Sequence, residues 1–266
     1  MGVRLQHDRV ASCCRRSVAR LQSALVSAAC GTAHGPQLRV GGSQCPQPAY
    51  PLIMAGRFLV LEGIDGCGKT TQLRQLADWL PDSGLMPSGA TLHLTREPGG
   101  TPLGRALREL LLNPPDESAP SPTAELLLYA ADRAQHVERL IRPALNRGDW
   151  VLSDRFSGST IAYQGDGRGL DLQTILDLER IATAGVSPDL TFWLDLPLQE
   201  SLKRRGACID DRIEAEGEAF LARVAEGFQR LSAERNWTAV AADQSADQVQ
   251  QVIRTRLRDW LGKALL

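Results

Sequence analysis

Cysteine, long apolar runs and an excess of charge of either sign are all scarce in this sequence of 266 residues. Six cysteines are too few for a secreted scaffold held together by disulfides, and only Cys67 and Cys208 lie beyond residue 53. No run approaches the roughly 18 apolar residues that a membrane-spanning helix requires. The 30 Lys and Arg against 31 Asp and Glu leave a net charge of −1, without the basic excess typical of nucleic-acid-binding proteins. These absences predict a cytoplasmic protein with reduced thiols, whose partners are neither membranes nor nucleic acids.

Residues 1–53 differ in composition from the rest of the chain. They contain six Arg, no Lys and a single acidic residue, Asp8, and they end in a run rich in Gly, Pro and Gln. We expect little fixed structure in such a stretch. Three origins fit it, namely a misassigned start with translation beginning at Met54, an organellar transit peptide, and a basic arm that contacts anionic surfaces. In each case we expect the chemistry to reside in residues 54–266.

Residues 54–266 alternate short apolar runs with segments of helical periodicity, a pattern typical of a parallel sheet wrapped by helices. Strands are predicted at 58–61, 92–95, 150–153, 190–194 and 238–241. Helices are predicted at 69–80, 102–112, 123–147, about 158–163, 172–184, 198–205, 219–234 and 247–261. In the longest helix, Thr123 is a suitable N-cap and Gly148 a suitable stop. This order predicts one α/β domain with a five-stranded parallel sheet.

The segment between the first strand and the first helix is a candidate phosphate-binding loop. It reads Gly63-Ile64-Asp65-Gly66-Cys67-Gly68-Lys69-Thr70, which matches G-x-x-x-x-G-K-[ST] in the strand–turn–helix context that the motif requires. The backbone N–H groups of such a loop surround the phosphates of a nucleotide, so residues 63–70 and Thr71 are predicted to bind ATP. Lys69 would reach the β and γ phosphates, and Thr70 would ligate Mg²⁺. We interpret Cys67 as a small filler of the loop, the alternative being partial thiolate character near a helix N-terminus.

Three further motifs separate the classes of protein that share this loop. No Asn-Lys-x-Asp motif for guanine recognition is present, which argues against a GTPase. The motifs are Arg96-Glu97-Pro98-Gly99-Gly100-Thr101, the segment 125–136 that includes Tyr129 and Arg133, and the segment 154–165 that begins Asp154-Arg155-Phe156-Ser157. Together with the loop, over about residues 58–261, they closely resemble the thymidylate kinases, which phosphorylate dTMP with ATP. The resemblance implies a P-loop nucleoside monophosphate kinase fold, ATP and dTMP as substrates, Mg²⁺ as cofactor, a place in dTTP biosynthesis and a homodimer.

The same resemblance implies a set of residues that bind dTMP. Tyr129, where the family more often has Phe, would stack on the thymine, and Arg133, one helical turn later, would donate to thymine O4. Arg96 and Arg155 would hold the acceptor phosphate, because a guanidinium fork matches phosphate oxygens. Spacing alone leaves open a core aromatic at Tyr129 and surface ion pairs for the two arginines. Thr160 and Gln164 would read the base and sugar edges, and Tyr163 would pack beside the deoxyribose.

Two acidic residues are assigned to the reacting centre. Asp154 ends the third strand, a Walker B-like position for a carboxylate that holds Mg²⁺ through water, although Asp is also common as a helix cap. Asp65 lies inside the phosphate loop, where the resemblance implies that it accepts the sugar 3′-OH or orients Arg155.

The variable positions of the loop, residues 64–67, carry no arginine, and similar enzymes that lack this arginine supply the cation from a lid. The segment of about 204–216, with Asp-Arg-Ile-Glu at 211–214, resembles the bacterial lid. We expect Arg204 or Arg205 to act on the transferred group, with Arg212 as a further candidate. The alternative is a solvated basic helix end. The predicted catalytic residues are therefore Lys69, Arg155, Asp65, Arg204 and Arg205.

Rival functions share the phosphate loop. A deoxynucleoside kinase or another monophosphate kinase would not need Tyr129 and Arg133 on the thymine side. A P-loop switch or motor would hydrolyse ATP without a small acceptor, and it gives no reason for the motifs at Arg96 and Arg155.

Overall fold

A five-stranded sheet forms the centre of the computed structural model, which describes residues 56–115, 119–205 and 212–264, all within one unit, Tyr50–Leu266. Every strand pair is parallel, in the order β2-β3-β1-β4-β5, which confirms the predicted α/β class. The strands are β1 (Arg57–Glu62), β2 (Leu92–Arg96), β3 (Trp150–Asp154), β4 (Leu190–Asp195) and β5 (Thr238–Ala241). Arg96 and Leu61 both pair in register with Asp154, so the carboxyl ends of the three strands meet at one edge.

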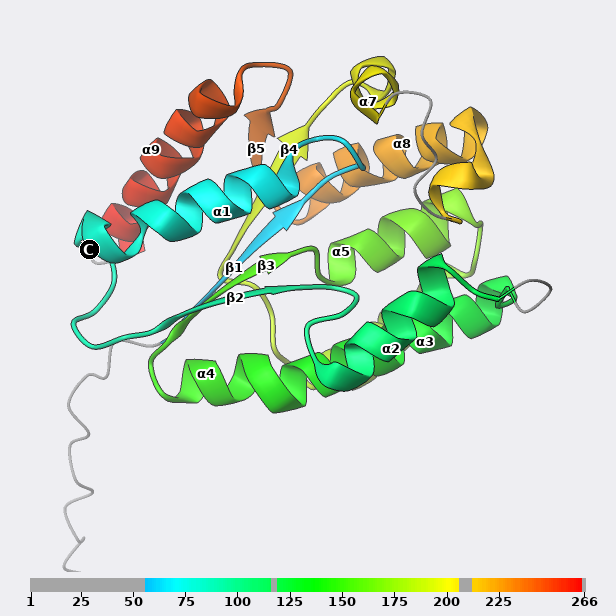
Figure 1. Cartoon of the computed structure of the whole chain (residues 1–266), viewed down its shortest axis with the longest axis horizontal. Helices are drawn as coiled ribbons and strands as arrows, with labels where there is room; N and C mark the ends of the chain where they lie inside the picture. The colour runs from blue at the N-terminus through cyan, green and yellow to red at the C-terminus, as the bar shows by residue number, and fades with distance from the viewer. Residues whose placement is uncertain (1–55, 116–118, 206–211, 265–266) are drawn as a thin grey trace, which may run out of the picture. The chain divides into compact units, whose positions relative to one another are not determined.

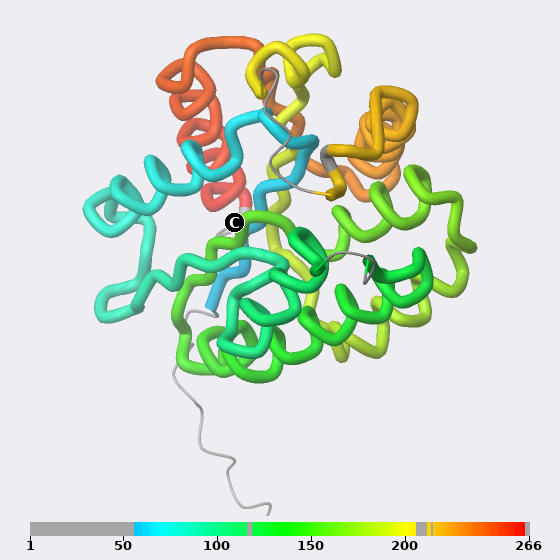
Figure 2. Tube along the Cα trace, turned by 45° about the vertical axis from the view of Figure 1, so that its right-hand side comes forward, coloured from blue at the N-terminus to red at the C-terminus, as the bar shows by residue number. Residues whose placement is uncertain are grey.

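Helices cover both faces of this sheet (Figure 1). They are α1 (Lys69–Trp79), α2 (Pro102–Leu112), α3 (Pro122–His136), α4 (Arg142–Asn146), α5 (Ser157–Thr160), α6 (Leu172–Thr183), α7 (Leu198–Arg205), α8 (Glu218–Glu234) and α9 (Ala246–Ala264). On one face α1 contacts α9, and Figure 2 shows the two side by side, while α3 and α4 lie on the other face. Short 3₁₀ helices, Pro81–Ser83 and Glu214–Glu216, were not expected from the sequence. Among the described residues, no helix is both long enough and apolar enough to cross a bilayer.

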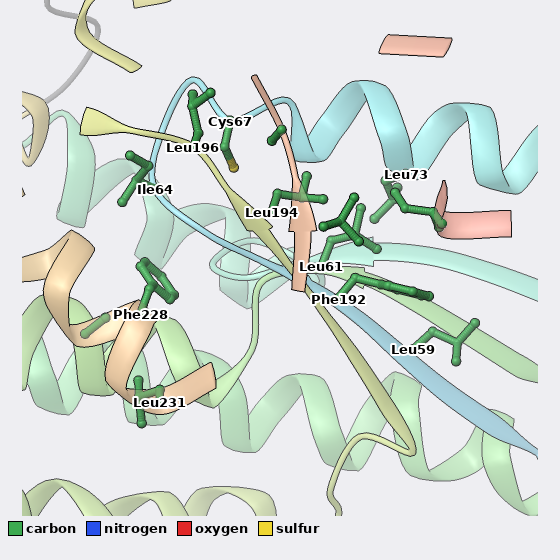
Figure 3. Packing of buried hydrophobic residues seen from close by; sticks show 14 of the residues in the cluster. Leu59, Leu61, Ile64, Cys67, Leu73, Phe192, Leu194, Leu196, Phe228 and Leu231 are labelled. Atoms are coloured by element: carbon green, nitrogen blue, oxygen red, sulfur yellow. The ribbon is translucent and has the colours of Figure 1, made fainter. Parts of the chain in front are cut away.

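The core lies on both faces of β1, because alternate side chains of a strand point to opposite sides. Leu59 and Leu61, both fully buried, join a cluster that includes Leu73 of α1 (Figure 3). Phe58 belongs to a second cluster, with Val137, on the opposite face. Each such side chain contributes about 1.5–3 kcal/mol of burial free energy, so β1 is fixed tightly and carries the phosphate loop at its end.

The expected regular helix over 123–147 is wrong in detail. The N-cap is Ser121 rather than Thr123, because Pro122 occupies the first helical position and the Ser121 hydroxyl accepts the N–H of Ala124 at 3.4 Å. Between α3 and α4 the backbone forms a π-helical turn at Val137–Ile141, and a second one, Ile161–Gly167, continues α5 beyond its expected end. The two π segments span only 5 and 7 residues, too few for their longer period to be distinguished in the sequence from that of an α-helix. The predicted stop is confirmed, since Gly148 adopts a φ of +82° two residues after α4.

Candidate active site

The phosphate loop connects the carboxyl end of β1 to α1, as the sequence predicts. Gly66 and Gly68 have φ angles of +76° and +94°, which favour glycine. A β-carbon at Gly66 would also lie 3.1 Å from the carbonyl oxygen of Ser201, so α7 packs directly on the loop. Ile64 and Cys67 point into the core, 4% and 2% exposed. These two side chains anchor the loop and leave its backbone to face a cavity.

Lys69 lies within the curve of its own loop. Its Nζ donates to the carbonyl oxygens of Gly63 and Ile64 at 3.0 and 2.9 Å, and it lies 3.9 Å from the carboxylate of Asp65. The side chain is 7% exposed. The ammonium is therefore held at the floor of the loop, where an anion entering the loop would meet it.

Cys67 is a structural filler rather than an activated thiol. Burial raises the pKa of its thiol, and the positive charges of Lys69 and Arg155 do not offset this effect. The alternative of a partial thiolate near the helix N-terminus is therefore not supported.

The two predicted metal ligands lie together. The hydroxyl of Thr70 donates to Oδ2 of Asp154 at 2.9 Å, joining the start of α1 to the end of β3. The other oxygen of Asp154, Oδ1, is buried and has no hydrogen-bond partner among the described residues. A hydroxyl and a carboxylate oxygen form the kind of oxygen donor set that Mg²⁺ prefers. The residues present therefore fit a magnesium ion at this position.

Arg155 is the hub of the site. Its Nη1 donates to the carbonyl of Gly63 at 3.1 Å and to Oγ of Ser159 at 2.9 Å, while its Nη2 contacts the carboxylate of Asp65 and the hydroxyl of Tyr163. The backbone of Arg155 has a φ of +71°, rare for a residue with a side chain and a mark of strain held by its surroundings. Tyr163 in turn donates to Oδ2 of Asp65 at 2.6 Å. Three predicted site residues thus form one network.

The charges in this network stabilise one another. Burial alone would raise the pKa of Asp65, but the Arg155 guanidinium and the Lys69 ammonium hold it well below its usual range. Burial alone would lower the pKa of Arg155, but Asp65 raises it well above its usual value. Both shifts favour the charged forms of Asp65 and Arg155, so the two groups form an ion pair near neutral pH.

Two cavities meet at this ion pair. One, of about 360 Å³, is lined by the phosphate loop with Lys69, Thr70 and Thr71 and by Arg96, Asp154 and Arg204. The other, of about 80 Å³, is lined by Tyr129, Arg133, Phe156, Thr160, Tyr163, Gln164 and Ile213 among others. Asp65, Glu97, Arg108 and Arg155 line both. The arrangement places a phosphate-binding cavity and a second, partly aromatic cavity on either side of Arg155.

The second cavity holds the residues predicted for dTMP. Arg133 is 3% exposed and donates through Nη2 to Oγ1 of Thr160 at 2.8 Å. Gln164 donates to the carboxylate of Glu125 at 2.8 Å, and Tyr129 is half-buried in the cavity wall. Arg96, in contrast, lies exposed on the phosphate-loop side, and no described residue pairs with its guanidinium. Of the residues predicted for dTMP, Arg96 therefore lines the phosphate-loop cavity and not the second cavity.

The described parts of the expected lid separate its arginines. Nη2 of Arg204 donates to the carbonyl of Ala242 at 2.8 Å, and Arg204 lines the phosphate-loop cavity. The stem of Arg205 lies beside Gly66 of the loop. Arg212 is on the other side, where it contacts the carboxylate of Glu125 and donates to the carbonyl of Leu111 at 3.1 Å. The remaining lid positions, 206–211, including Cys208, lie outside the described residues.

Several charged residues of the site were missed by sequence reasoning. Glu62, 1% exposed, accepts the N–H groups of Phe156 and Ser159 at 2.9 and 3.2 Å and so fixes the turn that carries Arg155. Glu125 receives Gln164 and Arg212, and also Arg168 at 2.9 Å. A carboxylate directly after an apolar strand, as at Glu62, is the signal that could have found it; Glu125 carries no such signal, because its partners are distant in sequence.

Comparison with known proteins agrees with this site. The family model described as thymidylate kinase matches residues 61–253. A thymidylate kinase of Synechococcus sp. (strain WH7803) is 76% identical over 204 residues, covering 77% of this chain and 96% of the relative. A thymidylate kinase of Prochlorococcus marinus (strain MIT 9313) is 68% identical over 209 residues, covering 79% of this chain and 97% of the relative.

A solved structure shows the same fold. The crystal structure of thymidylate kinase from Ehrlichia chaffeensis matches with a TM-score of 0.62 and 32% identity, covering 76% of this chain and 99% of that chain. The sequence similarity extends over most of the chain, and it agrees with the phosphate loop and the two adjoining cavities described above. The chain belongs to the thymidylate kinase family.

Proposed function

We propose that this protein transfers the γ-phosphoryl group of ATP to dTMP, giving ADP and dTDP on the route to dTTP. The observation that carries this proposal is the sharing of Asp65 and Arg155 between the phosphate-loop cavity and the second cavity. A kinase needs its donor and acceptor on opposite sides of one cationic group, whereas a P-loop switch needs only the donor side. Membership of the family names the substrates that fit the two sides.

On the donor side, the loop backbone and Lys69 hold the phosphates of ATP. Arg155 spans the two cavities, so its guanidinium lies beside the transferred phosphoryl group and stabilises the charge on its oxygens. The attacking oxygen of dTMP is already anionic, and no side chain has to act as a base. Catalysis is then positioning and charge stabilisation, and Asp65 keeps Arg155 in place.

Thr70 and Asp154 would hold Mg²⁺, which when bound neutralises charge on the phosphates. The unpartnered Oδ1 of Asp154 among the described residues supports this assignment. Arg204 and Arg205 lie at the phosphate loop and are the arginines proposed to act from the lid. Arg212 is engaged with Glu125 and takes a positioning role instead.

On the acceptor side, the ring of Tyr129 would stack on the thymine and Arg133 would donate to its O4. Thr160 and Gln164 would contact base and sugar, Tyr163 would pack beside the deoxyribose, and Arg96 would receive the 5′-phosphate. The cavity shared by Tyr129, Arg133, Thr160, Tyr163 and Gln164 supports their roles, and the place of Arg96 in the adjoining phosphate-loop cavity supports its contact with a phosphate.

The proposal extends to the whole chain. Residues 54–266 would form the catalytic domain with its lid at about 204–216, and residues 1–53 would take no part in the chemistry. The protein would act in the cytoplasm as a homodimer, without nucleic acid or membrane as partner. Large exposed apolar side chains on α2, α3 and α6 support a dimer.

The test is ADP release by the full chain and by the 54–266 fragment, with ATP and Mg²⁺, in the presence of no acceptor, dTMP, dUMP, dCMP or AMP. We expect release that depends strongly on dTMP, at equal rates for both proteins. Release without any acceptor would favour a switch or motor, and preference for another monophosphate would keep the fold but overturn the assignment of Tyr129 and Arg133.

A further inference from the structure

A chain of hydrogen bonds runs from Arg133, in the wall of the second cavity, through Glu97 to His136 and Thr95. Nε of Arg133 donates to Oε2 of Glu97 at 2.8 Å, Oε1 of Glu97 lies 2.9 Å from Nδ1 of His136, and Nε2 of His136 lies 2.6 Å from Oγ1 of Thr95. Arg133, Glu97 and His136 are 3%, 5% and 0% exposed. The hydrogen bonds of His136 go to Thr95 and Glu97, and neither of these is a predicted site residue.

One tautomer satisfies every member of this chain. With the proton assigned to Nδ1, His136 donates to Glu97 while its Nε2 accepts the hydroxyl proton of Thr95. The two oxygens of Glu97 are then occupied by His136 and Arg133, so the imidazole fixes the plane of the carboxylate that fixes the guanidinium.

The imidazole itself has no room to move. A β-carbon placed on Gly100 would lie 2.6 Å from Nε2 of His136 and 2.6 Å from Oγ1 of Thr95. The Arg96–Thr101 motif thus packs its glycine backbone directly against the ring. This close approach holds His136 from the side opposite Glu97.

The consequence for Arg133 is a restricted set of free donors. Nε is occupied by Glu97, and Nη2 donates to the carbonyl of Phe156 at 3.2 Å and to Thr160 at 2.8 Å. Nη1 has no hydrogen-bond partner among the described residues, and Arg133 lines the second cavity. The side chain therefore presents N–H donors, and no acceptor, to a ligand there. Such an edge donates to a ring carbonyl oxygen. It disfavours an exocyclic amino group, because two donors would then face each other.

We propose that His136 is a positioning residue that sets the preference of this site for a keto over an amino pyrimidine monophosphate, by fixing Arg133 through Glu97. The inference rests on the proposed function and deepens it. A mobile Arg133 could turn its donors away from an amino group, so loss of the His136–Glu97 bond weakens discrimination at C4 while leaving the chemistry at Arg155 in place.

Two amide substitutions separate this role from simple packing. The amide nitrogen of Asn occupies about the place of the imidazole Nδ1, so His136→Asn keeps a donor to Glu97. The amide nitrogen of Gln occupies about the place of Nε2, so His136→Gln loses that donor. Both variants leave a smaller side chain in the same buried space, and we expect both to lower Tm to a similar extent.

The measurement is kcat and KM of the full-length variants for dTMP, dUMP and dCMP, with dTMP and dCMP affinities by calorimetry in the absence of ATP. For His136→Asn, we expect the ratio of kcat/KM for dTMP to kcat/KM for dCMP to stay within about threefold of the wild-type value. His136→Gln should raise KM for dTMP and leave kcat within about threefold. The ratio of kcat/KM for dTMP to kcat/KM for dCMP should fall about tenfold, a loss comparable with one buried hydrogen bond.

Equal ratios in the two variants would overturn the inference, whether discrimination is kept or lost in both. Wild-type protein that binds dTMP and dCMP equally, or releases ADP without dTMP, would instead overturn the proposed function. If neither His136 variant folds, Glu97→Gln takes their place, because its NH2 group replaces one of the two oxygens that now face Arg133 Nε and His136 Nδ1. Unchanged discrimination in Glu97→Gln would then count against the relay.

Discussion

Arg155 combines a strained backbone with contacts to the loop carbonyl of Gly63, to Asp65 and to Tyr163. Each contact fixes one edge of the guanidinium fork, and the fork lies where the two cavities meet. Such a residue contributes to the rate through charge placement, which depends on geometry more than on charge alone.

Replacing Arg155 by Ala should lower kcat by about 10²–10³-fold, as for the loss of a preorganised donor at developing charge. Arg155→Lys should recover only a small part, because a compact ammonium does not reproduce the planar fork whose two nitrogens contact Gly63, Ser159 and Asp65. Steady-state kinetics measure the loss, and circular dichroism confirms that the variants are folded. A near-normal kcat in Arg155→Ala would contradict the assigned role.

The carboxylate form of Asp132 lowers the stability of the folded protein. It is 1% exposed, and burial together with the charge of Glu97 raises its pKa to about 6, against 3.8 ordinarily. The folded state therefore binds more protons than the unfolded state between about pH 4 and 6, and its contribution to stability falls as the pH rises through this window.

Asp132→Asn should be more stable than wild type by about 3 kcal/mol at pH 8, with the difference shrinking towards pH 4. The amide oxygen can still accept the N–H of Gly99, which Asp132 Oδ1 receives at 3.2 Å. Urea denaturation at pH 4, 6 and 8 measures the difference.

Asp149→Asn is the control, with the opposite sign. Hydrogen bonds from the backbone N–H of Thr91 and from the side chains of His93 and Arg147 lower the pKa of Asp149 to about 2. This carboxylate therefore stabilises the fold near neutrality, and its contribution is lost as the pH falls through that value. The same trend with pH in both variants would refute the argument for Asp132.

At the scale of elements, α3 is the helix that carries most of the acceptor side, with Tyr129 and Arg133 on it. Its start is fixed by the Ser121 cap and by Pro122, and its end continues into the π-helical turn Val137–Ile141. The start of this helix thus has a specific side-chain cause that can be removed without touching the site.

Ser121→Ala should lower the free energy of unfolding by about 1 kcal/mol, because one N–H at the helix start loses its acceptor. Thr123→Ala is the matched control, since Thr123 is exposed and already inside the helix, and we expect a change within about 0.5 kcal/mol. Urea denaturation of both variants at pH 7 makes the comparison. Equal losses, or a larger loss in Thr123→Ala, would show that the cap is misplaced.

Elements were largely predictable from the sequence, and their connections were less so. The strands and the helices α2 and α7 follow from apolar periodicity and from flanking Gly and Pro, which act over a few residues. The two π-helical turns and the choice of Ser121 over Thr123 depend on tertiary packing and on a single Pro, which periodicity does not register.

Some residues of the site were also predictable from the sequence, and others were not. The phosphate loop, Thr70 with Asp154, and Asp65 with Arg155 were identified from motifs, and the structure brings each pair together. The buried acids Glu62, Glu97 and Glu125 were not assigned roles, because each acts on residues dozens of positions away that only the fold brings near.

At the scale of the whole molecule, exposed apolar surface is concentrated on one group of helices. Of the large apolar side chains that are exposed among the described residues, Leu103, Leu110, Leu127, Leu172 and Ile181 lie on α2, α3 and α6, and only Leu94 lies elsewhere. α3 contacts both α2 and α6, so these three helices form one surface. Apolar surface gathered in this way is typical of an interface between protein chains.

The last prediction places the proposed homodimer on this surface. Ile181 of α6 is 68% exposed, and in a dimer its side chain would be covered by the partner copy. Ile181→Glu would place a charge in that interface, at a cost of several kcal/mol without a partner charge, and we expect the mass in solution to fall from two chains to one. Ile181→Leu keeps the apolar character and should remain dimeric.

Light scattering coupled to size-exclusion chromatography gives the mass, and Tm shows whether each variant is folded. An Ile181→Glu protein that stays dimeric would move the interface away from α6. A dimer would also explain why α3, which carries Tyr129 and Arg133 on its inner side, leaves Leu127 51% exposed on its outer side. If the interface forms there, α3 lies between the partner copy and the second cavity of its own chain. The Ile181→Glu monomer should then bind dTMP more weakly than the wild type.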